Sequence, residues 1–395
     1  MCMRCVKIAV FSIIISFFSS VFADVFPVPE YGYVIDFPEG FSLEDGSEDL
    51  SMLLFKHTIL PVQVLVKVWQ ADSYSSAEAA LQGTFAKLGG SGEVASLVWR
   101  NRNCAVSKMT LQNVALKSQC TGWSCVIPLA EKKGWLTLLS YAPTEVAYDC
   151  EQFLLSVLDA VMTDRGSYRD CGIITTYAYP SGPKKDLTLT IAGKKIKTQI
   201  GLDDDTASQF VIDREWAVFT LFANTKYAIE AWERFYRMIA RDSMGRTKKI
   251  AFDIQNALFA DAQKKDAAQP LAVIAQELLS WTQYFKYERA SETADKADFA
   301  SIPSVLAGGS SDCDSRSMLI ALLLRHMGVD ACIFISAEYS HAMLGVAFPE
   351  KQGQTIHVDG VDYLVGETTA KNLTLGMMDA SMQDRDKWYP VMFYE

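Results

Sequence analysis

A chain of 395 residues is too long for one ordinary hydrophobic core and predicts two or three domains. Half of its residues are apolar and 21% are charged, a composition that is typical of globular proteins and excludes a largely disordered chain. The net charge of −10 and the lack of a Lys/Arg cluster in the sequence argue against nucleic acid or anionic lipid as the main partner.

The first 23 residues have the pattern of a cleaved signal peptide. Arg4 and Lys7 precede an apolar stretch, Ile8–Phe22, and Val21-Phe22-Ala23 offers a signal peptidase the small residues at −3 and −1. The apolar stretch is shorter than the roughly 20 residues that a membrane-spanning helix needs. We therefore expect cleavage near Ala23, no stable membrane insertion afterwards, and a periplasmic or secreted mature protein.

The cysteines after this segment could form disulfides in an oxidising compartment. Nine cysteines minus Cys2 and Cys5 leaves seven, and an odd number leaves at least one thiol unpaired within the monomer. Five of them fall between residues 104 and 171, so we expect any disulfides in that region. The seven are Cys104, Cys120, Cys125, Cys150, Cys171, Cys313 and Cys332.

Residues 24–175 predict an α+β domain. Strands are indicated by β-branched and aromatic residues, partly with period two, between turn residues. A serine N-cap and a glycine stop indicate a helix over Ser75–Gly90. The expected strands are Tyr31–Pro38, Leu50–His57, Val62–Trp69, Val94–Trp99, Ala105–Leu111, Ala115–Gln119, Ser124–Pro128 and Trp135–Tyr141, and a closing helix follows over Tyr148–Met162. This order predicts an antiparallel sheet with helices on one side.

The opening "YGYVIDFPEGF" and the closing helix of this domain resemble the PsbP-like fold. The resemblance implies a fold, and no function is carried over from it. We expect this domain to offer a contact surface to a protein partner.

A Pro/Gly/Lys-rich stretch, Tyr179–Asp186, predicts a domain boundary near residues 175–185. Leu187–Leu202 alternates apolar and polar residues around a glycine, which indicates a β-hairpin. Helical spacing dominates from Lys226 to Leu258, so residues 186–265 predict a middle segment of β-hairpin and helices. The intervening "DDDT" is interpreted as a solvated helix start rather than a cation site.

Residues 266–395 carry the most specific pattern. Pro270–Glu288 predicts a helix with proline at its start, and "GGSSDCDSRSMLIALLLRHMG" predicts a loop followed by a buried helix. This second helix should begin at Cys313 and end at Gly328. Strands are expected at Val329–Ser336, Ser340–Phe348 and Asp362–Thr369, with a turn at Asp359-Gly360 before the last.

Cys313 is expected at the start of a helix, a position that favours a nucleophilic thiolate. The start of a helix points free N–H groups and the positive end of the helix dipole at the sulfur, which stabilises a thiolate. Asp312 and Asp314 oppose this effect because nearby negative charge raises the pKa of a thiol. A histidine within reach would offset the two acids by forming a thiolate–imidazolium pair.

His341 and Glu367 are the candidate partners of Cys313. His341 opens the second strand after the cysteine helix, and Glu367 lies at the end of the third. If these strands are antiparallel neighbours, the start of one lies beside the end of the other. A carboxylate there would hold the imidazole's tautomer and orientation, as in a Cys-His-acid triad.

The sequences "GGSSDCDSRSMLIALLLRHMGVDACIFIS", "HAMLGV" and "DYLVGETT" resemble the Cys, His and acid motifs of the transglutaminase-like superfamily, which has a papain-like fold. The resemblance covers residues 270–380. It implies Cys313 as nucleophile, His341 as general base and acid, and Glu367, in place of the family's commoner aspartate, as the orienting acid. It implies acyl transfer or hydrolysis at amide bonds of a peptide, protein or cell-wall peptide substrate, without a cofactor.

The second oxyanion donor, beside the backbone N–H of Cys313, stays open among Gln283, Trp281 and Tyr287. Two other readings of the site also stay open. Asp312, Cys313, Asp314 and His341 could bind zinc, although no second Cys/His pair stands at ligand spacing. The domain could instead be a degenerate, non-catalytic module that acts in binding or assembly. His326, His357 and Cys332 are interpreted as structural residues.

Overall fold

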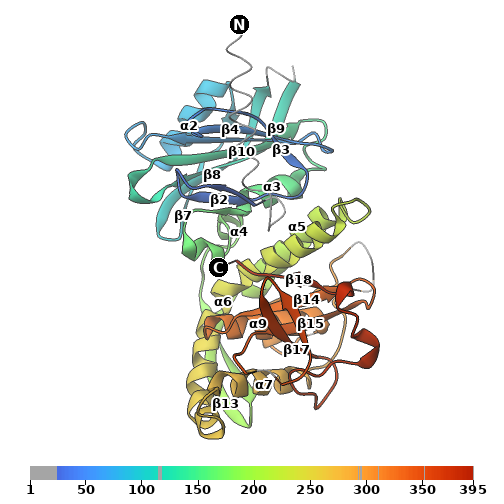
Figure 1. The fold of residues 1–395 in the computed structure, drawn as a ribbon. Coiled ribbons are helices and arrows are strands. Elements are labelled where there is room, and N and C mark those ends of the chain that lie inside the picture. The colour runs from blue at the N-terminus through green and yellow to red at the C-terminus, as the bar shows by residue number, and fades with distance from the viewer. Residues whose placement is uncertain are drawn as a thin grey trace.

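The computed structural model describes residues 25–113, 118–291, 293, 296–309, 311–350 and 352–394. The expected signal peptide (residues 1–23) and part of the expected strand Ala115–Gln119 lie outside these residues. Figure 1 shows two lobes, with α5 (Asp204–Thr220) and the first half of α6 (Ala228–Lys265) between them. Helices and antiparallel sheets occur in both lobes, so the chain is α+β as expected. The described helices include none with the length and apolar character needed to cross a membrane.

The N-terminal lobe is built around an antiparallel sheet whose strands run in the order β3-β4-β5-β10-β9-β8-β6, and β7 also pairs with β8. The strands are β3 (Phe41–Gly46), β4 (Met52–His57), β5 (Gln63–Trp69), β6 (Ser91–Gly92), β7 (Ala95–Trp99), β8 (Arg102–Asn113), β9 (Ser118–Pro128) and β10 (Trp135–Pro143). A smaller sheet joins β1 (Val25–Val28), β2 (Tyr33–Asp36) and β11 (Val161–Met162). The helices are α2 (Ala77–Leu88), α3 (Glu151–Asp159) and α4 (Ile173–Ala178), with 3-10 turns at Ala130–Lys132 and Arg165–Arg169.

Helices cover both faces of the large sheet, so the expectation of helices on one side was wrong. α2 packs on one face and α3 on the other (Figure 1). The reason is visible in β10, where the consecutive residues Leu138 and Leu139 point to opposite faces and are both fully buried. A strand that is apolar on both faces needs a covering layer on each.

Two element boundaries also differ from the prediction. The closing helix α3 ends at Asp159, because Val161 and Met162 leave the helix to pair with β2. Ser118–Pro128 forms one continuous strand, β9, in which Gly122 lies against Tyr141 of β10 without breaking the pairing. A glycine inside an alternating strand is read from sequence as a break, but here it allows close backbone approach.

All seven cysteines after the expected signal peptide are free thiols in the structure. Of the five between residues 104 and 171, where disulfides were expected if there were any, three lie in β8 and β9, Cys150 precedes α3 and Cys171 precedes α4. Four of them are buried, and Cys171 is partly exposed. Packing, and not covalent cross-linking, therefore holds this lobe together.

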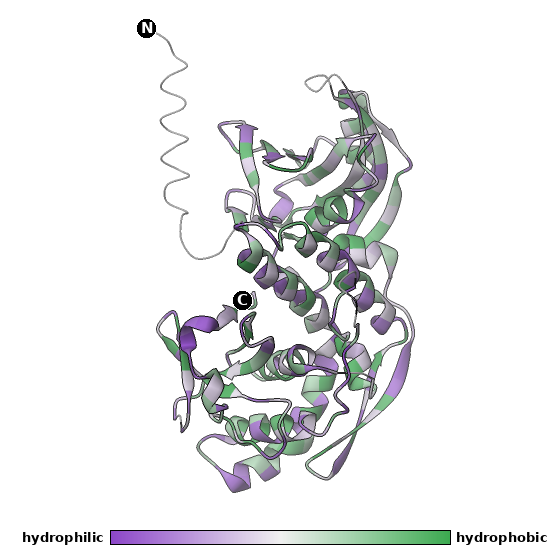
Figure 2. Cartoon of the chain, turned by 90° about the vertical axis from the view of Figure 1, so that its right-hand side faces the viewer, coloured by the Kyte–Doolittle hydropathy of each residue, from purple (hydrophilic) through white to green (hydrophobic). Residues whose placement is uncertain are grey.

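The middle segment and the C-terminal lobe share one hydrophobic core. The hairpin of β12 (Lys184–Ile191) and β13 (Lys194–Gly201) buries Ile191 and Ile196 against the same cluster as α6 and α9 (Cys313–His326). α5 adds Ile212 to this cluster. Figure 2 shows apolar residues in each of the two lobes.

The C-terminal lobe packs helices against an antiparallel sheet of order β16-β17-β15-β14-β18. Its strands are β14 (Ala331–Ser336), β15 (His341–Val346), β16 (Thr355–Val358), β17 (Val361–Gly366) and β18 (Tyr389–Val391), and its helices are α7 (Pro270–Thr282), α8 (Ile302–Leu306) and α9, with 3-10 turns at Ala380–Met382 and Arg385–Lys387. The expected helix and three strands at Val329–Ser336, Ser340–Phe348 and Asp362–Thr369 are all present. β16 carries His357 and forms a hairpin with β17 across the Asp359-Gly360 turn, and β18 is a short strand that the sequence pattern did not indicate.

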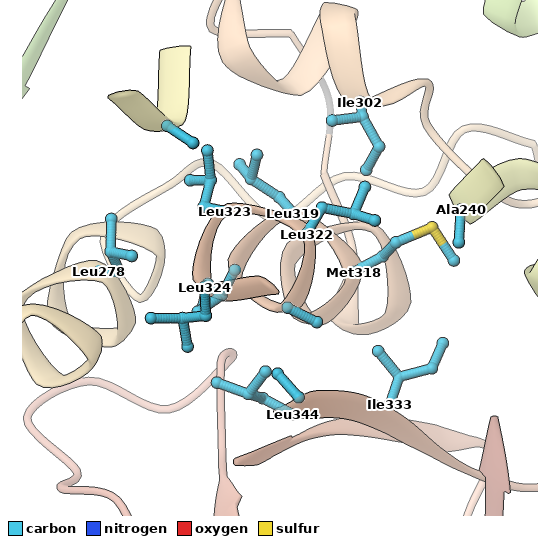
Figure 3. Close-up of a cluster of buried hydrophobic side chains, with 14 of the residues drawn as sticks. Ala240, Leu278, Ile302, Met318, Leu319, Leu322, Leu323, Leu324, Ile333 and Leu344 are labelled. Atoms are coloured by element: carbon cyan, nitrogen blue, oxygen red, sulfur yellow. The ribbon is translucent and has the colours of Figure 1, made fainter. Parts of the chain in front are cut away.

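α9 lies at the centre of this lobe, and its middle part, Met318–Leu324, is apolar on every side. Leu319, Leu322 and Leu323 are fully buried between helices and sheet, with Ile302 of α8 above them and Leu344 of β15 below (Figure 3). A helix that is apolar all round is held by packing in every direction. Its first residue, Cys313, is therefore fixed relative to β14 and β15.

Buried charges join the two lobes. Arg234 and Arg237 of α6 reach Asp36 at the end of β2, which has no exposed surface. Arg234 also donates to Glu215 of α5 at 2.8 Å. Tyr394, which follows β18, donates its hydroxyl hydrogen bond to the same Asp36. Segments far apart in sequence thus meet at one buried residue.

Glu39 lies beside this cluster, and its burial makes the stability of the protein depend on pH. Its carboxylate is 1% exposed, and neither oxygen has a hydrogen-bond partner among the described residues. Burial raises its pKa from 4.5 to about 8, although Arg234 and Arg237 act in the opposite direction and Asp36 adds to the rise. Above pH 4.5 the unfolded chain loses this proton while the folded chain keeps it until about pH 8, so stability falls across that window.

We expect Glu39→Gln to remove this loss. Its free energy of unfolding should exceed that of the wild type by up to roughly 4–5 kcal/mol near pH 8, at about 1.4 kcal/mol per pKa unit, and match it near pH 4.5. Urea unfolding at both pH values measures the difference. Equal stability of the two proteins at the higher pH would contradict the prediction.

Candidate active site

Cys313 is the first residue of α9, as expected, and Asp312 caps that helix. The Asp312 carboxylate accepts a hydrogen bond from the backbone N–H of Ser315 at 3.1 Å, and the Ser315 hydroxyl accepts one from the backbone N–H of Asp312 at 3.0 Å. This is a capping box, which satisfies free N–H groups at the helix start. Asp312, one of the two acids beside Cys313, therefore serves to cap the helix.

Asp314 is buried and accepts a hydrogen bond from the Tyr236 hydroxyl of α6 at 2.6 Å. Burial and the neighbouring Asp312 raise the pKa of Asp314 well above its ordinary value. Both acids raise the pKa of the Cys313 thiol, Asp314 more than Asp312.

His341 and Glu367 form the expected pair. His341 opens β15, and Glu367 follows directly on the end of β17. The pairing of Leu344 with Gly366 places the start of one strand beside the end of the other, and His341 Nε2 lies 2.7 Å from Glu367 Oε2. Because His341 Nε2 is bonded to Glu367, Nδ1 is the ring nitrogen that is available to exchange a proton with another group.

The Glu367 carboxylate is fixed on both oxygens. Oε1 accepts hydrogen bonds from the backbone N–H of Thr369 at 2.7 Å and from its hydroxyl at 2.6 Å. Burial raises the pKa of Glu367, but the hydrogen bonds from His341 and Thr369 outweigh it and hold the pKa below its ordinary value. Glu367 is therefore an anion at neutral pH and can stabilise a positively charged imidazole.

Cys313 is joined to both partners through the backbone. A hydrogen bond from the backbone N–H of Ala342, the residue after His341, acts on the thiol. The Thr368 hydroxyl, next to Glu367, donates to the Cys313 carbonyl at 3.3 Å. The helix start, the strand start and the strand end therefore meet in one place.

The thiol itself is held in its protonated form in the resting structure. Burial, followed by Asp314 and Asp312, raises the pKa of Cys313, and the N–H groups of Ala342 and Asp314 lower it only in part. Cys313 is partly exposed at the surface. Its activation requires a base, and His341 is the histidine whose strand contacts it.

The three candidate oxyanion donors, Gln283, Trp281 and Tyr287, differ in the contacts that they make in the structure. The Gln283 side-chain amide is committed to the carbonyls of Glu367 at 2.9 Å and Leu373 at 3.1 Å. The Trp281 ring packs edge-on against Phe285, with 4.8 Å between ring centroids.

Tyr287 forms an isolated bridge with Ser311, two residues before the cysteine. Burial, and next the charge of Cys313, raise the pKa of the Tyr287 hydroxyl to about 12. Of the three candidates, Tyr287 is the one with a hydroxyl near the nucleophile.

The other residues singled out from sequence have structural contacts. His326 Nε2 lies 2.8 Å from the Met244 carbonyl, and His357 Nδ1 lies 2.7 Å from Asp362. Cys332 is fully buried in β14. Across the described residues, no group of three His, Cys, Asp or Glu side chains is placed to hold a metal ion, so the zinc reading has no support in the geometry.

Sequence reasoning missed the residues that hold the site together. Thr368 and Thr369 bind the Cys313 carbonyl and the Glu367 carboxylate, and Arg316 bonds to three neighbouring segments. The only signal for Arg316 was a positive charge inside an apolar helix. A threonine pair after a strand carries no signal of its own.

Comparison with known proteins finds solved structures that are similar to the N-terminal third of the chain. No protein-family model and no curated protein matches the sequence. Solved structures that match include the Ran-binding protein Mog1p of Saccharomyces cerevisiae, with 11% identity, a TM-score of 0.28, and coverage of 36% of this chain and 96% of that one. Cyanobacterial PsbP from Synechocystis matches with 9% identity, a TM-score of 0.28, and coverage of 37% and 96%. A Mog1 mutant matches with 12% identity, a TM-score of 0.27, and coverage of 35% and 94%.

Proposed function

We propose that residues 266–395 form a transglutaminase-like, papain-like cysteine enzyme that acts on amide bonds of a peptide, protein or cell-wall peptide outside the cytoplasm. The observation that carries the proposal is the 2.7 Å hydrogen bond between His341 and Glu367, beside a cysteine at a helix start. The two residues come from different strands, and both side chains are largely buried. A buried His–carboxylate pair at a partly exposed thiol is the arrangement that nucleophilic catalysis requires.

In the first half of the reaction, His341 Nδ1 takes the proton of the Cys313 thiol. The thiolate attacks the amide carbonyl carbon, and the C=O electron pair moves onto the oxygen. In this proposal, the backbone N–H of Cys313 and the Tyr287 hydroxyl stabilise this oxyanion. His341 then gives its proton to the leaving amine as the C–N bond breaks, which leaves a thioester on Cys313.

In the second half, His341 takes a proton from water or from a second amine, which attacks the thioester carbonyl. The C–S bond breaks, and the thiol recovers its proton. Water gives hydrolysis, and an amine gives acyl transfer. Glu367 stays ionised throughout and compensates the charge of the imidazolium.

Alkylation by iodoacetamide tests the proposal. We expect Cys313 to react at least about tenfold faster than Cys171, the other partly exposed thiol among the described cysteines. Mass spectrometry of peptides after timed labelling measures both rates in one sample. An electrophilic amide probe should label the wild type and not Cys313→Ala.

The rival function, a non-catalytic module for binding or assembly, is favoured by one observation. Burial raises the pKa of Cys313, as it does for the inert thiol of Cys332. Equal, slow labelling of Cys313 and Cys171, together with no labelling by the amide probe, would favour that function and reject the enzyme.

A further inference from the structure

Arg316 lies one turn after Cys313 on α9 and is 1% exposed. Its guanidinium donates three hydrogen bonds, to the Ser311 hydroxyl at 3.0 Å, the Thr368 carbonyl at 3.1 Å and the Phe285 carbonyl at 2.8 Å. Five N–H donors in a rigid plane allow one arginine to bind several segments at once.

The three acceptors belong to the three segments that carry the proposed reacting groups. Ser311 precedes the nucleophile, and Thr368 follows Glu367. Phe285 belongs to the segment after α7 that carries Tyr287, whose ring centroid lies 5.4 Å from the Arg316 guanidinium carbon. One side chain therefore sets the distances among the thiol, the orienting acid and the hydroxyl.

Arg316 has no carboxylate partner within ion-pair distance among the described residues; its partners are neutral oxygens and a ring. Burying a charge without a counter-charge is costly, so a purely structural site would favour a neutral side chain. Burial lowers the pKa of Arg316, whereas Asp312, Tyr287, Cys313 and Glu367 raise it, so its charge acts on the thiol and its neighbours.

We propose that Arg316 is a positioning residue that fixes the segments carrying Tyr287, Cys313 and Glu367 and places an unpaired positive charge where it stabilises the Cys313 thiolate. This inference rests on the proposed function. It also explains how a thiol between two acids can be activated. The positive charge of Arg316 offsets the negative charge of Asp312, which disfavours the thiolate. His341 is the base that takes the proton of the thiol.

The thiol is faced by charged or titratable groups from every element around it. Burial and the two acids of α9 oppose its ionisation, and Arg316 and a protonated His341 favour it. The groups are Asp312, Asp314 and Arg316 on α9, Tyr236 on α6, Tyr287 after α7, His341 on β15 and Glu367 after β17. Arg316 is the only permanent cation in this set.

The pH dependence of Cys313 alkylation by iodoacetamide, on the folded protein, tests the inference. Arg316→Met removes the charge and the hydrogen bonds; the midpoint of the rate–pH curve should rise by about one pH unit and the rate near pH 7 should fall roughly tenfold. Arg316→Lys keeps the charge but not the planar fork. Its midpoint should stay close to the wild-type value while the rate falls.

Arg325→Met is the matched control. Arg325 lies on the same helix, is largely buried and also donates to backbone carbonyls, those of Ala331 and Tyr394. Its replacement should lower the thermal stability and leave the alkylation curve of Cys313 unchanged.

An unshifted curve in a folded Arg316→Met variant would overturn the inference, as would an equal shift in Arg325→Met. If Arg316→Met does not fold, Arg316→Gln keeps a hydrogen-bonding side chain without the charge, and the same outcomes apply. Failure of the proposed function gives a different result, because Cys313 of the wild type would then react no faster than Cys171.

Discussion

Replacing His341 with alanine is expected to slow the alkylation of Cys313 and its reaction with an amide probe by about 10²–10⁴-fold at neutral pH. The reason is that burial and two acids raise the pKa of the thiol, so it ionises only when a base takes its proton. Labelling that is quenched at a series of times, followed by mass spectrometry of the peptides, measures the rate. Glu367→Gln should give a smaller loss, since the amide still accepts a hydrogen bond but cannot balance an imidazolium.

A matched control for this experiment exists on the neighbouring hairpin. His357 and Asp362 form a second His–carboxylate pair at 2.7 Å, but their side chains are exposed. His357→Ala should leave the reactivity of Cys313 unchanged. If His341→Ala labels as fast as the wild type, the thiol does not depend on this histidine, and the triad is not a catalytic unit.

The second large effect is expected on stability. Asp36→Asn leaves the buried guanidinium group of Arg237 without its carboxylate, since Asp36 is fully buried, whereas Arg234 keeps Glu215. Removing one partner of a buried ion pair typically costs about 3–5 kcal/mol, because the remaining charge stays desolvated. Urea unfolding at pH 7, followed by tryptophan fluorescence, measures the loss.

An exposed ion pair supplies the comparison. The Glu338 side chain is 61% exposed and lies 2.8 Å from Lys387. Glu338→Gln should change the free energy of unfolding by less than about 1 kcal/mol, as is usual for exposed pairs. A cost for Asp36→Asn no greater than that for Glu338→Gln would mean that water reaches the junction between the lobes.

The elements that positioned the candidate site could be predicted because local signals agreed. A capping acid, an apolar run and Gly328 with positive φ define α9, and alternation defines β15. The Asp359-Gly360 turn, with positive φ at both residues, fixes the beginning of β17, and Glu367 directly follows the end of that strand. The meeting of His341 and Glu367 followed from the antiparallel pairing of β15 with β17.

The rest depends on contacts that no local pattern encodes. The burial of Asp36 is decided by α6, about 200 residues later, and Arg316 acts through carbonyl groups of three separate segments. Gln283 was a reasonable oxyanion donor by type, but its amide is taken by two carbonyls that sequence cannot place. Helices on both faces of the large sheet were missed because turn residues suggest where strands end, not which face is covered.

The contact between Asp36 and Tyr394 bears on the order in which the protein assembles. A contact across 358 residues has a high loop-closure entropy, so it forms after the local pairings of either lobe. Until Tyr394 and α6 arrive, the finished N-terminal sheet holds Asp36 in water. Docking of the lobes is then a late step on the folding pathway, distinct from the folding of each, and a refolding experiment should resolve it as a slower phase.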